Sequence, residues 1–313
     1  MAVAKAAALD AGLPLYRHLR GRQGGTLPLP LMHVISGGLH AFGGVDFQEF
    51  QFISLGASTF RETYAIGNRL YHATLKILQE QEEYGELFGD DGGLAPALES
   101  NEEVVAVMTD AIRAAGLRPR EDVGIFLDVA ATHFHKDGLY RLSAEGRELS
   151  STGMIDYLEE ISTAYPVLSI EDGLAEEDWE GWAQLTRRLG NRVQLIGDDL
   201  FVTNVGRIRK GIERGVANAV LIKVNQIGSV TETKEAIDLA KQAGYEPVLS
   251  ARSGETEETI IAHLAVGFDV REGKFSGLRS TEFLAKINEL FRIEEELADK
   301  GNYAGKAPLA RFL

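Results

Sequence analysis

Four short apolar stretches decide the fold: VGIFLD at 123–128, VLSIED at 167–172, VQLIGDD at 193–199 and AVLIKV at 219–224. Each is the length of a strand buried on both faces, and each ends in charged residues. Between these stretches lie amphipathic helical patterns near 151–164, 174–189 and 203–214. Alternation of this kind predicts a parallel sheet with helices outside it.

The pattern continues in both directions from these stretches. Toward the C-terminus it predicts strands at 247–252 and, more weakly, at 266–270, with helices near 230–243, 255–265 and 281–300. Toward the N-terminus it predicts strands at 27–32 and 47–53, followed by helices at 58–83 and 101–117. Two strands, two helices and six strand–helix units make eight strands, which close a TIM-like (β/α)₈ barrel of order ββαα(βα)₆. An open doubly wound sheet is the alternative, but no Gly-rich phosphate turn follows the first strand.

The domain organisation is predicted to be simple. Residues 1–20 form an alanine-rich helical pattern that ends near Gly21, so 1–25 is interpreted as a helical extension and linker. Residues 26–313 are interpreted as one barrel domain, because no linker or low-complexity tract follows residue 25.

Composition excludes several classes of function. The net charge of −15 argues against binding to nucleic acid, whose phosphates it would repel. The absence of cysteine excludes disulfides and thiol catalysis, and no apolar run is long enough to cross a membrane. The first residues lack the continuous apolar segment of a secretory signal. We therefore expect a cytoplasmic protein.

The strand ends carry the candidate chemistry. Asp128, Glu171 and Asp198 end three successive strands, and the carboxyl ends of barrel strands meet at the face where active sites lie. Three hard oxygen ligands suit Mg²⁺ rather than zinc. The alternative is a network of ion pairs that only closes the barrel mouth. The sequential placement, with a lysine in the next strand, favours the metal site.

Cations near the same face would offset the acidic surface. Lys223 is expected to be a neutral base, because burial and a nearby metal ion both disfavour its charged form. A buried salt bridge is the alternative for this residue. Arg252, Ser253 and Lys274 offer a guanidinium fork, a hydroxyl and an ammonium for an anionic substrate.

Longer motifs link these residues to a known family. They read GGLHA at 37–41, FQEF at 47–50, GDDGGLAP at 89–96, LDVA at 127–130, SIEDGLAE at 169–176, GDDLFVTN at 197–204, LIKVNQ at 221–226 and RSGETE at 252–257. With them the chain resembles the enolases, the phosphopyruvate hydratases of glycolysis, over essentially its whole length.

The resemblance implies a role for each candidate residue. Asp128, Glu171 and Asp198 would hold Mg²⁺, and Lys223 would remove the α-proton of 2-phosphoglycerate. Arg252, Ser253 and Lys274 would bind the phosphate and carboxylate of the substrate. Around the leaving hydroxyl, the implied residues are Gln48, Glu49, His40 and Asp91. Because family members are dimers, a homo-oligomer is also implied, although the sequence itself leaves the oligomeric state open.

The chain departs from the family pattern at several points. Asp91 stands where the family has glutamate, Ala251 where it has histidine, and Leu39 where it has a small polar residue. The small N-terminal domain of the enolases, which supplies a mobile loop over the substrate, is expected to be missing. The kept residues Asp128, Glu171, Asp198, Lys223 and Arg252 favour a Mg²⁺-dependent lyase that interconverts 2-phosphoglycerate and phosphoenolpyruvate, and these departures are expected to reduce its efficiency. Two alternatives remain: an enzyme that abstracts an α-proton from another carboxylate, and a non-catalytic enolase-like binding protein.

Overall fold

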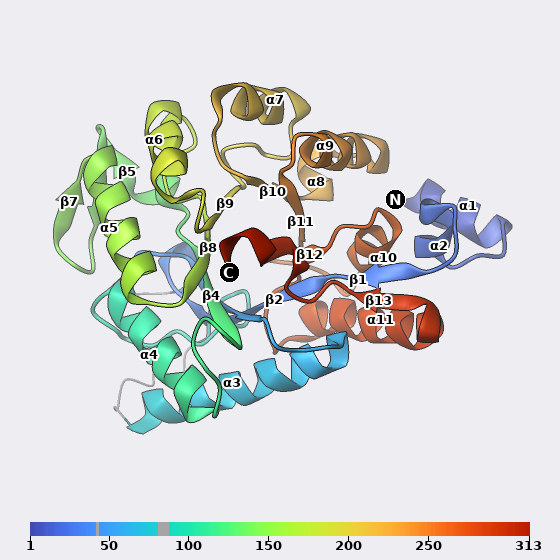
Figure 1. Cartoon of the computed structure of the whole chain (residues 1–313), viewed down its shortest axis with the longest axis horizontal. Coiled ribbons are helices and arrows are strands. Elements are labelled where there is room, and N and C mark those ends of the chain that lie inside the picture. Colours follow the sequence, from blue (N-terminus) through green and yellow to red (C-terminus); the bar gives the residue numbers. More distant parts are fainter. Residues whose placement is uncertain (42–43, 81–87) are drawn as a thin grey trace.

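The computed structural model describes residues 1–41, 44–80 and 88–313, and its centre is a closed barrel of eight strands (Figure 1). In chain order these are β2 (Leu29–Ser36), β3 (Glu49–Ser54), β4 (Val123–Asp128), β8 (Val167–Glu171), β9 (Gln194–Gly197), β10 (Ala219–Ile222), β11 (Glu246–Ser250) and β12 (Glu272–Lys274). The predicted TIM-like (β/α)₈ barrel of order ββαα(βα)₆ is therefore confirmed.

Helices surround the barrel, as Figure 1 shows: α3 (Phe60–Glu80), α4 (Asn101–Ala114), α5 (Ser151–Ala164), α6 (Trp179–Leu189), α7 (Val205–Arg214), α9 (Val230–Gln242), α10 (Ile260–Gly267) and α11 (Thr281–Leu297). Several begin where a polar side chain accepts a hydrogen bond from the first turn, as Ser100, Ser150 and Ser229 do. The end of the helix expected at 58–83 lies outside the described residues. Among the helices that are described, none combines the length and apolarity needed to cross a membrane.

β3 runs antiparallel to both of its neighbours. Glu49, its first residue, is therefore paired with Ser36 at the end of β2 and with Asp128 at the end of β4. All other neighbouring strands are parallel. The reversal brings Gln48 and Glu49, which lie at the start of a strand, to the same face of the barrel as residues that end strands.

The last predicted strand was wrong in position. Residues 266–267 belong to α10, while the eighth strand is β12, whose residues Glu272, Gly273 and Lys274 are all buried. All but one of the eight residues of α10 are buried. A helix that is buried on almost every side has a continuous apolar sequence, and such a sequence is also typical of a buried strand. β12 escaped prediction because two of its three residues are charged and are satisfied by partners from other strands.

The N-terminal region also differs from the single helix expected over residues 1–20. It forms α1 (Ala2–Asp10) and α2 (Leu15–Arg20), separated at Gly12, whose φ of +63° favours glycine, and Pro14, which caps α2. Glycine ends α2 as expected, because Gly21 adopts a left-handed conformation. α2 packs against α10, and β1 (Gly25–Leu27) pairs with β13 (Gly301–Tyr303).

Two further elements were not predicted. A small antiparallel sheet of β5 (His135–Lys136), β6 (Leu139–Leu142) and β7 (Arg147–Leu149) is inserted after β4. At the other end of the chain, a 3₁₀ helix (Ala307–Phe312) lies across the barrel in Figure 1. Its Leu309 and Phe312 pack against residues of the barrel interior, namely Leu29, Leu31, Ile53, Phe126 and Leu168.

A chain of polar side chains crosses the barrel interior. Ser169 Oγ donates to Gln194 Oε1 at 2.7 Å, and Gln194 Nε2 donates to Glu272 Oε2 at 2.7 Å. All three side chains are fully buried, and Glu272 Oε1 has no hydrogen-bond partner among the described residues. Burial raises the pKa of Glu272 to about 8, an effect only partly offset by the hydrogen bond from Gln194. Glu272 is therefore a neutral carboxyl group at pH 7.

Candidate active site

A cavity of about 360 Å³ opens at the carboxyl ends of the barrel strands. It gathers residues from the first strands, the loop at 90–91 and the last strands of the chain. Its lining includes every predicted site residue except Glu171: His40, Gln48, Glu49, Asp91, Asp128, Asp198, Lys223, Arg252, Ser253 and Lys274. Glu171, fully buried, lies beneath it at the end of β8. The sequence thus predicted one site whose residues the fold brings together.

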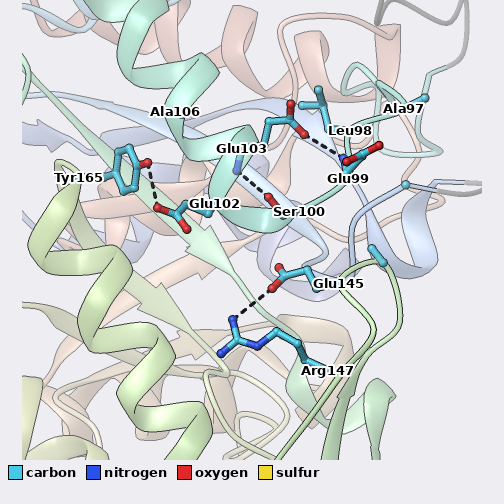
Figure 2. Close-up of a pocket in the computed structure, with 12 residues that line it drawn as sticks. Ala97, Leu98, Glu99, Ser100, Glu102, Glu103, Ala106, Glu145, Arg147 and Tyr165 are labelled. Carbon is cyan, nitrogen blue, oxygen red and sulfur yellow. Dashed lines mark hydrogen bonds and ion pairs between the residues drawn. The ribbon is translucent and has the colours of Figure 1, made fainter.

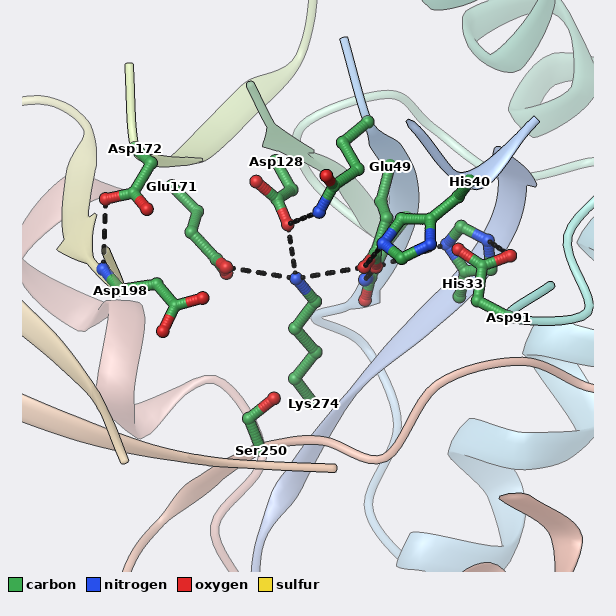
Figure 3. A network of polar contacts seen from close by, with 12 residues as sticks. His33, His40, Glu49, Asp91, Asp128, Glu171, Asp172, Asp198, Ser250 and Lys274 are labelled. Carbon is green, nitrogen blue, oxygen red and sulfur yellow. Dashed lines mark hydrogen bonds and ion pairs between the residues drawn. The ribbon is translucent and has the colours of Figure 1, made fainter. Parts of the chain in front are cut away.

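Lys274 lies at the centre of the site (Figure 3). Its Nζ is 2.7 Å from Asp128 Oδ2, 3.1 Å from Glu171 Oε1 and 3.3 Å from Glu49 Oε1. The side chain is only 4% exposed, so its charge must be compensated within the protein. Burial alone would lower the pKa of Lys274, but Asp128, Glu171 and Glu49 raise it well above its usual value.

Lys223 follows β10 and forms an ion pair with Asp198 Oδ2. The sequence predicts a neutral amine for Lys223, whereas this ion pair favours the charged ammonium. Burial lowers the pKa of Lys223, but the charges of Asp198 and Glu171 outweigh burial and raise it. Of the two alternatives for this residue, the ion pair is the one observed. Acid groups from other strands surround the amine of Lys223, and the sequence alone could not show how closely they do so.

Negative charge exceeds positive charge around these two lysines. Burial, followed by the charge of Asp128, raises the pKa of Glu171 well above its usual value. Burial and the charges of Asp198 and Asp199 do the same for Asp172. Asp172 was not predicted as a site residue. It accepts hydrogen bonds from the backbone N–H groups of Asp198 and Asp199 at 3.0 and 2.7 Å, and its φ of +44° is unusual for a residue with a side chain.

The donor set fits a divalent cation. Glu171 Oε2 is buried and has no hydrogen-bond partner among the described residues. Oxygen atoms of Asp172, Asp198 and Asp199 lie within 4.8 Å of one another, so a cation here would also reach carboxylates beyond the predicted set. Carboxylate oxygens are ligands that Mg²⁺ prefers, and a cation here would offset the repulsion between these acids. Asp128, Glu171 and Asp198 remain the predicted ligands, although Lys274 and Lys223 now pair with them.

Mg²⁺ is expected to stabilise the folded protein. A ligand at about a hundred times its dissociation constant adds roughly 2.7 kcal/mol, so the melting temperature should rise by several degrees. In Glu171→Gln this rise should shrink to about half or less, because one carboxylate oxygen pair is neutralised. Differential scanning fluorimetry with and without Mg²⁺ measures both, with Glu160→Gln, an exposed glutamate of α5, as the control. An equal rise in the Glu171 variant would exclude Glu171 as a ligand.

The opposite wall of the pocket is formed by Glu49, Asp91 and His40. His40 Nδ1 is 2.6 Å from Asp90 Oδ1, and its Nε2 is 3.8 Å from Glu49 Oε1. Beneath them lies His33 of β2, which was not predicted: its ring contacts Ser36 and Asp91 and approaches Glu49. A histidine in an apolar strand gave no signal in the sequence, since its partners are 16 and 58 residues away.

The rim carries the remaining predicted residues. Arg252 is half-buried, and its Nη1 donates to Asn225 Oδ1 at 3.0 Å, while Ser253 is exposed. Glu255 Oε1 accepts from the backbone N–H of Arg252 at 3.3 Å, and Glu255 in turn pairs with the fully buried Lys286 at 2.8 Å. The loop is thus anchored to α11, and Arg252 and Ser253 line the pocket.

A larger hollow of about 970 Å³ lies elsewhere, beside the N-terminus of α4 (Figure 2). Two of its acidic groups are already engaged: Tyr165 donates to Glu102 at 3.1 Å, and Arg147 pairs with Glu145 at 3.5 Å. It lacks the convergence of lysines and buried acids that marks the barrel mouth, so size does not make it the better candidate.

A TIM barrel with acids and lysines at the carboxyl ends of its strands has the architecture of a barrel enzyme. The sequence matches the family model described as the enolase C-terminal TIM barrel domain over residues 25–311. The chain therefore belongs to the enolase family, and the match indicates an enzyme of the lyase type.

Proposed function

We propose that this protein is a Mg²⁺-dependent lyase that interconverts 2-phosphoglycerate and phosphoenolpyruvate. One observation carries the proposal: a single pocket is lined by Lys223, by the wall of Glu49, Asp91 and His40, and by Arg252 with Ser253. Lys223 pairs with Asp198, which Figure 3 shows across the site from that wall. A base and a separate group of acids on opposite walls suit a substrate that loses a proton from one carbon and a hydroxyl from the next. The rim cation and hydroxyl suit its phosphate.

In the first step Lys223, as the neutral amine, takes the proton from C2 of 2-phosphoglycerate. The C–H electron pair moves onto the substrate carboxylate, which becomes an enolate with two negative charges on its oxygens. Lys223 must first lose the proton that its ion pair with Asp198 favours. The free energy needed to deprotonate this amine is therefore part of the free energy needed to form the active complex.

In the second step the electrons return from the enolate, a double bond forms between C2 and C3, and the C3–O bond breaks. In the substrate complex the departing hydroxide takes a proton from Glu49 or His40 of the acidic wall, since Asp91 is held as a carboxylate, and leaves as water. Gln48 lies beside this wall and donates to Asp128 at 3.4 Å. The atoms balance as 2-phosphoglycerate giving phosphoenolpyruvate and water.

Asp128, Glu171 and Asp198 are the residues proposed to hold the divalent cation, which when bound acts as a Lewis acid toward the substrate carboxylate. Lys274 keeps Asp128, Glu171 and Glu49 in place and presents its ammonium beneath the substrate. Arg252 and Ser253 orient the phosphate from the rim.

The proposal is tested by incubating the protein with 2-phosphoglycerate and Mg²⁺ and following phosphoenolpyruvate by ³¹P NMR. Product should form catalytically and should stop forming when EDTA removes the metal. Parallel incubations with 3-phosphoglycerate and unphosphorylated glycerate test the need for phosphate at the correct carbon. If no phosphoenolpyruvate forms even with protein and substrate at equal concentrations, the proposed reaction is wrong.

A further inference from the structure

His33 lies directly beneath the acidic wall of the pocket, yet it does not line the cavity. Its side chain is fully buried within β2. Nε2 is 2.9 Å from Ser36 Oγ and 3.1 Å from Asp91 Oδ1, and Nδ1 is 3.5 Å from Glu49 Oε2. The ring thus stands between two carboxyl groups that face the cavity, as Figure 3 shows. Any role it has in the reaction must act through them.

The hydrogen bonds place a proton on Nε2. Ser36 Oγ donates to Asp91 Oδ1, so the remaining Ser36 lone pairs can only accept. Nε2 must then donate to the Ser36 oxygen, and it points the same N–H toward Asp91. Gly93 N–H also donates to Asp91 Oδ1, at 3.2 Å. Asp91 Oδ1 therefore accepts hydrogen bonds from Ser36 and Gly93 and lies 3.1 Å from His33 Nε2. Burial raises the pKa of Asp91, but His33 and Ser36 outweigh burial and lower it, so Asp91 is held as a carboxylate.

The other ring nitrogen faces Glu49. A lone pair on Nδ1 would point its negative end toward a carboxylate, whereas an N–H would be attracted to it. The charged groups around the ring are Asp91, Glu49 and Lys274, from three different elements. Burial lowers the pKa of His33, but Asp91 and Glu49 outweigh both burial and Lys274 and raise it. A proton on each ring nitrogen would therefore face one acid group, Asp91 through Nε2 and Glu49 through Nδ1.

The loop that carries Asp91 is shaped around this ring. A Cβ on Gly93 would lie 2.2 Å from His33 Nε2, and a Cβ on Gly89 would lie 2.3 Å from Ser36 Oγ. Both are far closer than real contacts, and His33 and Ser36 sit on a buried strand that cannot move aside. The two glycines thus let the loop close onto His33, which sets where Asp91 stands relative to Glu49.

We propose that His33 is a positioning residue for the dehydration step, in which it bridges Asp91 and Glu49 and fixes the spacing of the two carboxyl groups that receive the leaving hydroxyl. The inference rests on the proposed function and deepens it, because it separates the two halves of the reaction. Lys223, on the far wall, does not contact His33, so removal of the α-proton should not depend on the ring.

The kinetic test compares the two steps in His33→Ala and His33→Gln. Glutamine keeps an N–H donor toward Ser36 and Asp91 without the charge. Phosphoenolpyruvate formation should fall about 100-fold in His33→Ala and less in His33→Gln, because a displacement of about 1 Å at reacting groups costs on the order of 10²-fold. Exchange of the C2 proton of 2-phosphoglycerate for deuterium should change less than about threefold. A parallel fall in both rates, or no fall in either, would overturn the proposal.

His263→Ala is the matched control, since His263 is a part-buried histidine of α10 paired with Glu289 at 3.0 Å and remote from the pocket. It should leave both rates unchanged. Circular dichroism and melting temperature show whether each variant folds. If His33→Ala does not fold, His33→Gln alone decides between the outcomes.

A second readout does not depend on turnover. ¹⁵N-labelled histidine in the unliganded protein should give an imidazolium signal for His33 at neutral pH, assigned by its loss in His33→Gln. In Asp91→Asn that signal should become the neutral form protonated at Nε2. If the protein fails to convert 2-phosphoglycerate, the proposed function fails, and the spectrum still decides whether His33 bridges the acids. A neutral His33 in the unaltered protein at neutral pH would exclude the bridge.

Discussion

Replacement of Lys223 by alanine is expected to lower phosphoenolpyruvate formation by about 10³-fold or more, because a positioned general base contributes on the order of 10²–10⁴-fold to the rate. Exchange of the C2 proton should fall by a similar factor. Lys223 is the pocket lysine best placed for this role, since Lys274 is held by three carboxylates. Steady-state assays and ¹H NMR in D₂O measure the two losses.

Lys223→Arg separates the base from the ion pair. Arginine keeps a positive charge next to Asp198, but its guanidinium does not lose a proton under these conditions. The arginine variant should therefore be nearly as stable as the unaltered protein and almost as inactive as the alanine variant. Lys136→Ala, an exposed lysine of β5, controls for loss of a lysine in general. Substantial proton exchange in Lys223→Arg would show that the base is another group.

Glu272→Gln is expected to stabilise the protein in alkaline solution by on the order of 3–5 kcal/mol and to have little effect at about pH 5. The pKa of Glu272 is about 8 in the folded protein, above its ordinary value of 4.5. Between these values the unfolded chain has lost the proton while the folded chain still holds it. Stability therefore falls as pH rises through this window and levels off above about pH 8, at roughly 1.4 kcal/mol per pKa unit.

Glutamine removes this titration but preserves the size and the acceptor that Gln194 uses. Guanidinium denaturation at about pH 5 and about pH 9 measures the difference. Glu235→Gln, an exposed residue of α9, should show no comparable pH-dependent gain. If Glu272→Gln destabilises the protein equally at both pH values, Glu272 is not a neutral group in the barrel.

The fold could be predicted where strands are apolar and helices amphipathic. The strand at 123–128 and the helix at 151–164 were predicted with the boundaries that the structure has. β12 could not be found in this way, because Glu272 and Lys274 are buried by virtue of Gln194, Asp128 and Glu171 on other strands. Hydrophobic periodicity describes one segment at a time and cannot show partners that only barrel closure supplies.

The site, like the fold, contains residues that the sequence reveals and residues that only the three-dimensional structure reveals. Acids at strand ends are visible in a sequence, because parallel strands bring their carboxyl ends to one face. His33 and Asp172 give no such signal: His33 is one histidine in an apolar strand, and Asp172 resembles an ordinary loop residue that follows Glu171. The ion pair of Lys223 with Asp198 could not be foreseen either, since the number of carboxylates around an amine depends on packing in three dimensions.

The position of β12 has a consequence for biosynthesis. This three-residue strand joins β11 to β2, and the 3₁₀ helix whose Leu309 and Phe312 pack against the barrel interior follows it in the chain. While the chain is being synthesised, β2 and β11 therefore have no partner at one edge until residues 272–274 have emerged from the ribosome. Such open edges invite pairing with other chains. Closure of the barrel thus waits for the synthesis of β12, and until then the open edges of β2 and β11 expose the nascent chain to aggregation.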